Sequence, residues 1–298
     1  MSSKPAQAVL QPARARLWAD FVALTKPRVN LLVLVTTVIG FHLGNQGGAD
    51  LALLFHTVVG TLLVASGAAA FNQVLERDVD AKMRRTMSRP LPDRRIDAGD
   101  ATWFAFGLSA AGVLQLWLGA NGLAAGVALT TLLLYAIVYT PMKRVTSLAT
   151  IVGSVPGALP PVIGWAAANG TLALEAWVLF AIMFFWQMPH VLALAYMFRE
   201  DYARGGVRVL PVEEPDGRST GLQIVNYSAA LVPVSLLPTV IGMAGRVYFA
   251  AAVVLGLAGV VMAIRFARQR TPAAARQLFY LSLMYLPVLW VLMLANRA

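Results

Sequence analysis

The sequence predicts an all-α membrane protein: a bundle of nine transmembrane helices around a central cavity, with its N-terminus in the cytoplasm. Three observations support this fold class. First, 58% of the 298 residues are hydrophobic and only 13% are charged, which is too little charge to cover a soluble protein of this length. Second, nine apolar runs approach the roughly 20 residues that cross a bilayer as a helix. Third, the positive charges fall almost entirely on one side of those runs.

The apolar runs define the elements in order, and each must be helical because backbone polar groups cannot stay unpaired in lipid. We predict spans at about residues 27–44, 51–75, 101–120, 122–140, 148–168, 172–197, 220–242, 246–265 and 276–295. Residues 1–20 lack the short apolar core and cleavage site of a signal peptide, so we expect a flexible cytoplasmic tail there. Residues 21–298 then form a single transmembrane domain. The absence of cysteine excludes disulfides and thiolate metal sites.

The distribution of charge predicts the orientation. All but Arg246 and Arg297 of the 24 Lys and Arg lie in the N-terminal tail or in the loops after the second, fourth, sixth and eighth runs. All but Asp50 and Glu175 of the 14 Asp and Glu lie on that same side. The positive-inside rule places this side in the cytoplasm. We therefore expect an integral protein of a bacterial inner membrane, a setting favoured by the short N-terminal tail, with its chemistry facing the cytoplasm.

The most informative stretch is NQVLERDVDAKMRRTMSRPLP, residues 72–92, at the end of the second run. Asn72, Glu76 and Asp80 recur every four residues, so on a helix they share one stripe at intervals of about 6 Å. Asn72 lies inside the span, where a polar side chain is costly unless it faces the bundle interior. Carboxylate and amide oxygens facing a cavity suit Mg²⁺ that also binds a diphosphate. Asp78 points away from this stripe and is free to pair with an arginine.

Basic residues follow the stripe and recur in two later loops. Arginine offers paired hydrogen bonds to phosphate oxygens, so we expect these side chains to hold a diphosphate. The predicted ligands are Arg77, Lys82, Arg84, Arg85 and Arg89, together with Lys143 of YTPMKR and Arg204 and Arg208 of the loop after the sixth run. The alternative is an ordinary helix end whose acids pair with neighbouring arginines, with Lys143 as an interface anchor.

The sixth run and the loop after it supply two further candidate sites. Glu200 and Asp201 form a second acidic pair, which would let two Mg²⁺ ions bridge one diphosphate across the bundle. His190 lies about two turns inside the span after Pro189 and is a functional candidate, either for haem iron or for proton transfer. The alternative for His190 is a hydrogen-bonded histidine within the bundle. His42 and His56 lie near the outer ends of their spans, where a hydrogen-bonded histidine within the bundle is the favoured interpretation, and both could also coordinate haem.

Together these motifs resemble the UbiA-type intramembrane prenyltransferases, whose first motif is N-D-x-x-D-x-x-x-D followed by basic residues and R-P-L. The stretches LTKPRVNLLVLVTTVIGF, NQVLERDVD, YTPMKR, WQMPHVLALA and DYARGGVRVLPV resemble the protohaem IX farnesyltransferase branch of that family. The likeness runs from about residue 20 to the end. Gln73 and Glu76 stand where the general motif has Asp, and the D-x-x-x-D spacing of the second motif is not present around Glu200 and Asp201.

The resemblance implies an activity, a cofactor and partners. It implies transfer of a farnesyl group from farnesyl diphosphate to a vinyl group of haem b, with water addition, to give haem O and diphosphate. It assigns Asn72, Glu76 and Asp80 to Mg²⁺-diphosphate, with Glu200 or Asp201 as further ligands, and His190 to haem. The product would serve haem-copper oxidases, so haem A synthase or oxidase assembly proteins are expected partners, alongside membrane lipid and without nucleic acid.

Three alternatives remain at this point. One is a transferase that prenylates an aromatic acid in a quinone pathway, which would need a site for the acceptor carboxylate. Another is a transporter, for which intramembrane charges would line a path through the bilayer; the crowding of charges on one face argues against it. The third is a haem-binding subunit without catalysis, which would leave the acidic motifs without a role.

Overall fold

The computed structural model describes residues 13–45, 47–48 and 50–297, with side chains from residue 17 onward. Within these residues, nine helical stretches are long and apolar enough to cross a membrane, and they coincide with the nine predicted runs. Seven are single helices: α2 (Pro27–Gly44), α3 (Leu51–Asp80), α4 (Ala98–Gly119), α9 (Leu174–Met197), α12 (Arg218–Val240), α13 (Arg246–Gln269) and α14 (Pro272–Ala295). The prediction of a nine-span helical bundle is therefore confirmed.

The fourth and fifth spans are each divided. The fourth runs through α5 (Gly122–Leu133), the π-helix η1 (Leu134–Tyr139) and α6 (Thr140–Met142). The fifth consists of α7 (Ala149–Ala158) and α8 (Pro160–Asn169), joined at Leu159. The break is explained by Pro160, which has no amide hydrogen to continue the hydrogen-bond ladder. Short helices α10 (Arg199–Gly205) and α11 (Leu210–Glu213) lie in the loop after α9.

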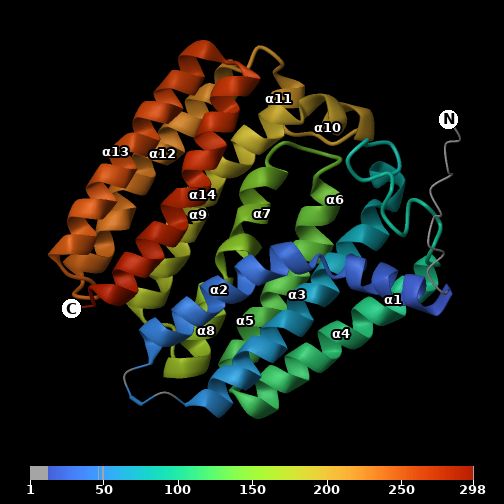
Figure 1. Cartoon of the computed structure of the whole chain (residues 1–298), viewed down its shortest axis with the longest axis horizontal. Helices are drawn as coiled ribbons and strands as arrows, with labels where there is room; N and C mark the ends of the chain where they lie inside the picture. Colours follow the sequence, from blue (N-terminus) through green and yellow to red (C-terminus); the bar gives the residue numbers. More distant parts are fainter. Residues whose placement is uncertain (1–12, 46, 49, 298) are drawn as a thin grey trace, which may run out of the picture.

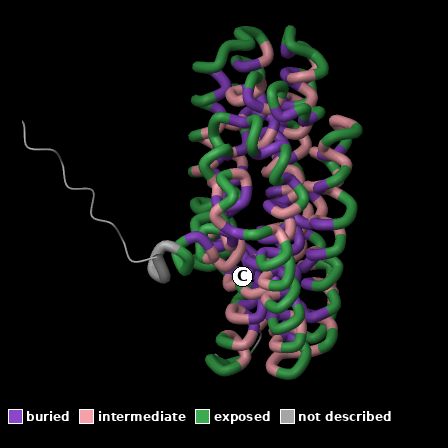
Figure 2. Tube along the Cα trace, turned by 90° about the vertical axis from the view of Figure 1, so that its right-hand side faces the viewer, coloured by how far each residue is buried: buried purple, intermediate pink, exposed green. Residues whose placement is uncertain are grey.

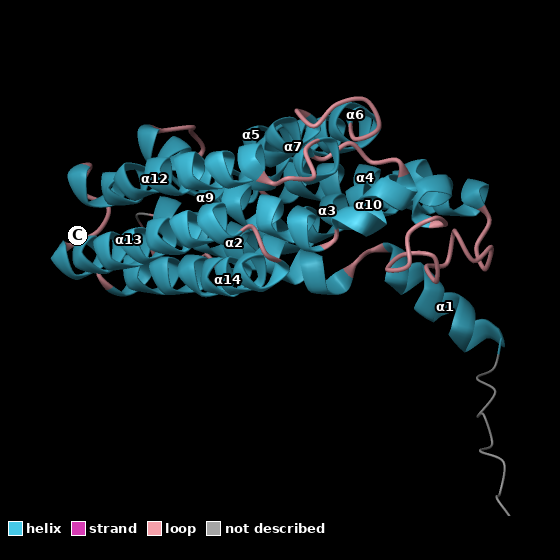
Figure 3. Cartoon of the chain, turned by 90° about the horizontal axis from the view of Figure 1, so that it is seen from above, coloured by secondary structure: helices cyan, strands magenta, loops and turns pink. Residues whose placement is uncertain are grey.

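A further helix precedes the first span. Helix α1 (Ala13–Leu24) begins within the segment assigned above to a flexible tail, so residues 13–20 are helical and only residues 1–12 of that segment lie outside the described chain. In Figure 3, α1 extends away from the bundle. It is held by the Phe21 ring, 4.9 Å from that of Phe104, and by Asp20, whose carboxylate lies 3.1 Å from Nε of Arg95.

The spans pack in two neighbouring groups, with α9, α12, α13 and α14 together and α2 to α8 beside them (Figure 1). Helices α2 and α8 approach each other closely. A methyl group built at Gly164 would lie 1.9 Å from the carbonyl oxygen of Thr37, and one at Gly40 would lie 2.0 Å from that of Pro161. Only glycine permits these backbones to approach so closely, as is common where membrane helices cross.

The outer surface of the bundle is apolar. Buried residues follow the interior in Figure 2, while exposed residues cover the outside. Large hydrophobic side chains on the spans are among the exposed ones, including Leu31 (61%), Val254 (66%) and Val291 (62%). Such a surface would be unfavourable in water and is suited to contact with lipid chains.

The charged loops gather at one end of the bundle, which we call the loop end. It consists of residues 81–97, residues 143–148 and residues 198–217, at the upper right of Figure 1. The backbone N–H of Arg208 donates to the carbonyl oxygen of Lys143 at 2.7 Å, and that of Arg84 donates to the Asp201 carboxylate at 2.9 Å. At the opposite end, Arg297 donates to the carbonyl oxygen of His42 at 3.2 Å.

Candidate active site

The predicted stripe of α3 lines a cavity at the loop end. Helix α3 continues unbroken to Asp80, so Asn72, Glu76 and Asp80 all point to the same side. Their exposed fractions are 2%, 9% and 1%. We call this space, of about 160 Å³, the polar cavity; its polar lining consists of Lys26, Asn72, Glu76, Asp80, Arg85, Thr86, Arg89, Tyr135, Tyr139, Lys143, Thr150, Tyr202 and Arg208. The structure thus brings together the three stripe residues and four of the predicted basic ligands.

Two lysines contact the first two members of the stripe. Lys143 Nζ lies 2.8 Å from Glu76 Oε1, and Lys26 Nζ donates to Asn72 Oδ1 at 2.7 Å. Asn72 also donates through Nδ2 to Thr140 Oγ1 at 3.3 Å, which fixes its amide with the oxygen toward the lysine. A lysine ammonium group therefore contacts one oxygen atom of Glu76 and one of Asn72, two of the residues that the sequence predicts to bind Mg²⁺ and diphosphate.

Lys26 is a residue that the sequence analysis did not single out. It lies in the stretch LTKPR, directly before Pro27 at the start of α2, and its backbone adopts a left-handed conformation with φ of 49°. Burial, reinforced by the charges of Arg89 and Lys143, lowers the pKa of Lys26 to about 7. A lysine placed immediately before a span was the available signal, but its pairing with Asn72 depends on how α2 packs beside α3.

The third member of the stripe is paired with an arginine from the following loop. Arg89 Nη1 lies 2.7 Å from Asp80 Oδ2. Thr86 Oγ1 donates to the carbonyl oxygen of Asp80 at 2.9 Å, so the loop after α3 folds back over the end of its own helix. This fold-back is what places Arg89 beside the stripe rather than in solvent.

The π-helix η1 forms another wall of the polar cavity. Tyr135 and Tyr139 both line it, and Lys143 Nζ lies 4.3 Å from the centre of the Tyr139 ring. Short π segments inside α-helices often occur at functional sites, where the extra residue changes which side chains face inward. The apolar pattern of the fourth run gave no sign of this segment, so the sequence analysis missed Tyr135.

The remaining predicted basic ligands lie elsewhere. Arg84 and Arg204 line a separate pocket behind the loop. Arg77 is on the outer side of α3, where its Nε lies 3.5 Å from Oδ1 of Asp78, as the helical wheel predicted for that aspartate. Lys82 is exposed and is not among the residues that line the polar cavity. The structure therefore supports Arg85, Arg89, Lys143 and Arg208 as cavity residues and does not bring the other four there.

The second acidic pair does not line the polar cavity. The Asp201 carboxylate accepts hydrogen bonds from the backbone N–H groups of Arg84 at 2.9 Å and Arg85 at 3.2 Å, and it pairs with Arg204. Burial alone would raise the pKa of Asp201, but these hydrogen bonds hold it below its usual value. Glu200 is exposed. Asp201 thus anchors the arginine-bearing loop to α10.

Because Glu200 and Asp201 lie outside the polar cavity, the structure does not bring the two predicted acidic sites together around one diphosphate. Across the described part of the chain, no group of three or more Asp, Glu or His residues could hold a metal ion on its own. Asn72, Glu76 and Asp80 nevertheless offer an amide oxygen and two carboxylates to one cavity. Mg²⁺ is commonly bound by one or two carboxylates and completed by water and substrate phosphates, so this donor set fits a metal that arrives with a diphosphate.

The histidines lie apart from one another. His190 is half-buried between the rings of Trp186 and Phe279, whose centres lie 5.1 and 4.5 Å from its own, and its Nδ1 is 2.8 Å from Ser282 Oγ. It lies next to Val191, which lines the polar cavity. His56 Nδ1 contacts Gln115 Nε2 at 2.7 Å toward the other end of α3.

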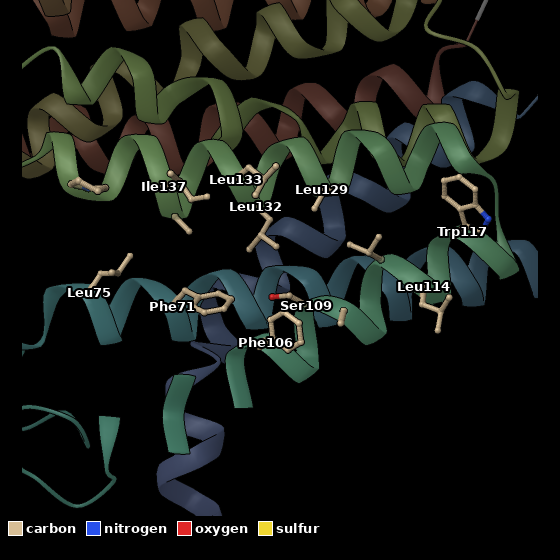
Figure 4. A pocket seen from close by; sticks show the side chains of 14 residues that line it. Phe71, Leu75, Phe106, Ser109, Leu114, Trp117, Leu129, Leu132, Leu133 and Ile137 are labelled. Atoms are coloured by element: carbon tan, nitrogen blue, oxygen red, sulfur yellow. The ribbon is translucent and has the colours of Figure 1, made fainter. Parts of the chain in front are cut away.

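A larger depression in the bundle carries no charge. It has a volume of about 880 Å³ and lies between α3 and α4 on one side and α5 and η1 on the other (Figure 4). Its lining is aliphatic and aromatic except for Ser109, and it extends from Leu75 to Trp117. It has no group that could bind a diphosphate, so the polar cavity is the candidate active site and this groove suits an alkyl chain.

Comparisons with known proteins agree with the fold and the motifs. Residues 33–289 match the UbiA prenyltransferase family. The chain is 50% identical over 287 residues to the protoheme IX farnesyltransferase of Solibacter usitatus, covering 93% of this chain and 98% of that protein. It is 42% identical over 300 residues to the protoheme IX farnesyltransferase of Koribacter versatilis, covering 97% of each chain.

Solved structures share the architecture at low sequence identity. A digeranylgeranylglyceryl phosphate synthase superposes with a TM-score of 0.80 at 14% identity, over 94% of this chain and 98% of that one. A UbiA homolog from Archaeoglobus fulgidus, bound to DMAPP and Mg²⁺, gives a TM-score of 0.67 at 15% identity, over 92% and 99% of the two chains. From the sequence match and the shared fold together, the chain belongs to the UbiA prenyltransferase family, in its protoheme IX farnesyltransferase branch.

Proposed function

We propose that this protein transfers a farnesyl group from farnesyl diphosphate to a vinyl group of haem b, with addition of water, to give haem O and diphosphate. The observation that carries the proposal is the polar cavity, where an amide and two carboxylates of α3 face three half-buried cations. The relatives from Solibacter usitatus and Koribacter versatilis, both protoheme IX farnesyltransferases, supply the identity of the two substrates.

Asn72, Glu76 and Asp80 are the residues that would hold Mg²⁺, since they place an amide oxygen and two carboxylates along one wall of the cavity. When bound, the ion neutralises charge on the diphosphate and so favours its departure. One structure of the Archaeoglobus fulgidus homolog contains DMAPP and Mg²⁺, and a second contains GPP and Mg²⁺. Glu200 and Asp201 have no part in this assignment, because neither lines the cavity.

The cations of the cavity bind and stabilise the diphosphate. Arg89, Lys143 and Lys26 lie against the stripe, and Arg85 and Arg208 complete the lining from the two loops. As the allylic C–O bond breaks, negative charge accumulates on the departing oxygen. Donors fixed in place before the reaction stabilise that charge without reorganisation, which is the main source of rate acceleration in such sites. Arginine adds paired N–H donors to these contacts.

The carbon chain of the substrate requires an environment poor in water. The cavity lining includes Val191 and Ala195 of α9 and the rings of Tyr135 and Tyr139. Aromatic faces attract cations, so these rings would favour the allylic cation left on the farnesyl group. A vinyl carbon of haem b then forms the new C–C bond, water adds its hydroxyl to the neighbouring carbon, and one proton is released.

The orientation of the protein follows from the charge distribution. We infer that the loop end faces the cytoplasm of a bacterial inner membrane, because it contains 11 of the 24 Lys and Arg residues, whereas the opposite end has only Arg246 and Arg297. Farnesyl diphosphate would then enter with its diphosphate at the aqueous end and its tail among the spans. The product would supply haem-copper oxidases, with haem A synthase or assembly proteins as the recipients.

The proposal is tested by analysis of pigments. Membranes from cells with and without the protein are extracted, and haem species are separated by reversed-phase chromatography and identified by mass. We expect a farnesylated, hydrated haem only where the protein is present, and with purified protein only when haem b, farnesyl diphosphate and Mg²⁺ are all supplied. Consumption of farnesyl diphosphate with an aromatic acid, but not with haem b, would contradict the proposal and favour the quinone-pathway alternative.

A further inference from the structure

A second pocket lies behind the loop that closes the polar cavity. It has a volume of about 430 Å³ and we call it the arginine pocket, after the four arginines in its lining: Arg84, Arg85, Arg199 and Arg204. Glu200 and Asp201 are its two acidic residues. Four positive and two negative side chains leave a formal charge of +2. The pocket therefore suits a ligand, or part of one, that carries two negative charges.

Arg199 is the side chain with the strongest requirement for such a ligand. Its Nη1 is buried, and no hydrogen-bond partner for it occurs among the residues that the structure describes. The guanidinium lies 4.4 Å from the centre of the Tyr196 ring, which fixes its position but satisfies no N–H donor. A buried donor without a partner costs free energy, which an anionic oxygen in the pocket would recover.

Arg204 and Arg85 have partners that define the shape of the pocket. Arg204 pairs with Asp201, so its charge is largely balanced within the protein. Arg85 lies 5.0 and 5.5 Å from the ring centres of Phe198 and Tyr202. It lines both the arginine pocket and the polar cavity, so the two spaces share a wall. The two spaces are therefore adjacent, with the Arg85 side chain between them.

We propose that the arginine pocket binds the two propionate carboxylates of the haem acceptor. The inference rests on the proposed function, which requires an acceptor with a reactive vinyl group beside the diphosphate. Protohaem carries both carboxylates on one edge of the ring, and a vinyl group lies on the far side from them. Anchoring the carboxylates beside Arg199 and Arg84 therefore turns the vinyl edge away from the aqueous surface, while Arg85 separates the carboxylates from the diphosphate.

The test compares haem b with its dimethyl ester, in which both carboxylates are masked. The full-length protein is placed in phosphatidylcholine nanodiscs, and binding of each porphyrin is followed by its Soret absorbance. We expect the wild type to bind haem b about tenfold more tightly than the diester, the effect of one or two charge-assisted hydrogen bonds in a partly exposed pocket. In Arg199→Gln this preference should fall to about twofold or less, with binding of the diester and the KM for farnesyl diphosphate unchanged.

Two further variants control for structural damage. Arg84→Gln changes an exposed side chain of the same pocket and should reduce the preference in the same direction. Arg268→Gln removes an exposed arginine of α13 outside the pocket and should leave the preference intact. Equal losses for haem b and the diester, or no loss in either pocket variant, would overturn the proposal.

Lipid binding and a failure of the proposed function each give a distinct result. If the arginine variants alter binding only in nanodiscs containing phosphatidylglycerol, the pocket holds a lipid headgroup and the propionate assignment is wrong. If the wild type discriminates haem b from its diester but forms no farnesylated haem, the proposed function fails while the carboxylate site stands. Because binding is measured without turnover, the two failures are distinguishable.

Discussion

Lys143 Nζ and Glu76 Oε1 lie 2.8 Å apart in the polar cavity, with only 17% and 11% of their side chains exposed. The pair joins α3 to the end of the fourth span. Removing one member of a buried ion pair leaves an uncompensated charge, which costs about 3 kcal/mol or more. We expect Lys143→Met to lower the thermal midpoint of the protein markedly and to abolish transfer.

The double variant Glu76→Gln/Lys143→Met separates these effects. With both charges removed, the stability should return close to that of the wild type, because no buried charge is left unpaired. Transfer should remain absent, since Glu76 is a proposed metal ligand. A double variant as unstable as Lys143→Met would show that the lysine acts by packing and not by charge.

Asp80 and Asp78 form a matched pair for testing the metal assignment. Asp80 is 1% exposed and faces the polar cavity, whereas the Asp78 side chain is 76% exposed and pairs with Arg77 outside it. We expect Asp80→Asn to reduce turnover by about a hundredfold or more, in line with the loss of a group that supports the developing charge. Asp78→Asn should keep turnover within about twofold. Similar losses in both variants, measured as haem O per minute, would contradict the assignment.

Asp201 predicts a pH dependence of stability. Its pKa is held below the usual value by the N–H groups of Arg84 and Arg85 and by Arg204. A carboxylate whose pKa is lowered by folding stabilises the folded state at pH values above its unfolded-state pKa of about 3.9. That stabilisation is lost as the pH falls through the folded-state pKa. The thermal midpoint of Asp201→Asn should therefore lie below that of the wild type at pH 7, and the difference should narrow on acidification below about pH 4. A difference that is the same at every pH would contradict this account.

His190 predicts an effect on haem rather than on the diphosphate. Because Nδ1 contacts Ser282 Oγ, Nε2 is the nitrogen left for an iron ligand. We expect His190→Ala to weaken haem b binding and to reduce turnover about tenfold, and Ser282→Ala to do so less, as is usual for a residue that orients a ligand. The KM for farnesyl diphosphate should not change. Unchanged haem affinity and turnover in His190→Ala would leave the histidine a packing role between Trp186 and Phe279.

Much of the fold could be predicted because lipid imposes a simple rule on the sequence. Each span must be a helix of sufficient length, so the apolar runs alone placed all nine. The second run was predicted to end near residue 75, yet α3 continues to Asp80. Its last turn is polar, and the charges that stabilise it, Lys143 and Arg89, lie in other segments of the chain. The hydropathy of the second run cannot show that charges from other segments stabilise this last turn.

The three stripe residues could be predicted from their four-residue spacing, but the residues that contact them could not. Asn72, Glu76 and Asp80 are related by helical geometry alone, so their common direction was predictable. Lys26 is 46 residues from Asn72, and Asp201 is 117 residues from Arg84. Such contacts depend on how separate spans pack. The sequence analysis therefore assigned six arginines to one diphosphate site, whereas the folded chain divides five of them between two pockets and leaves Arg77 outside both.

The position of the polar cavity has a consequence for how the reaction ends. In the orientation proposed above, the polar cavity lies toward the cytoplasm, so each product would leave into the medium that suits it. Diphosphate dissolves in the aqueous phase, whereas the haem gains a chain whose burial in lipid is worth about 0.8 kcal/mol for each CH₂. Reversal would require both products to meet again in the polar cavity. In the proposed orientation, product partitioning would therefore favour synthesis in addition to the chemistry itself.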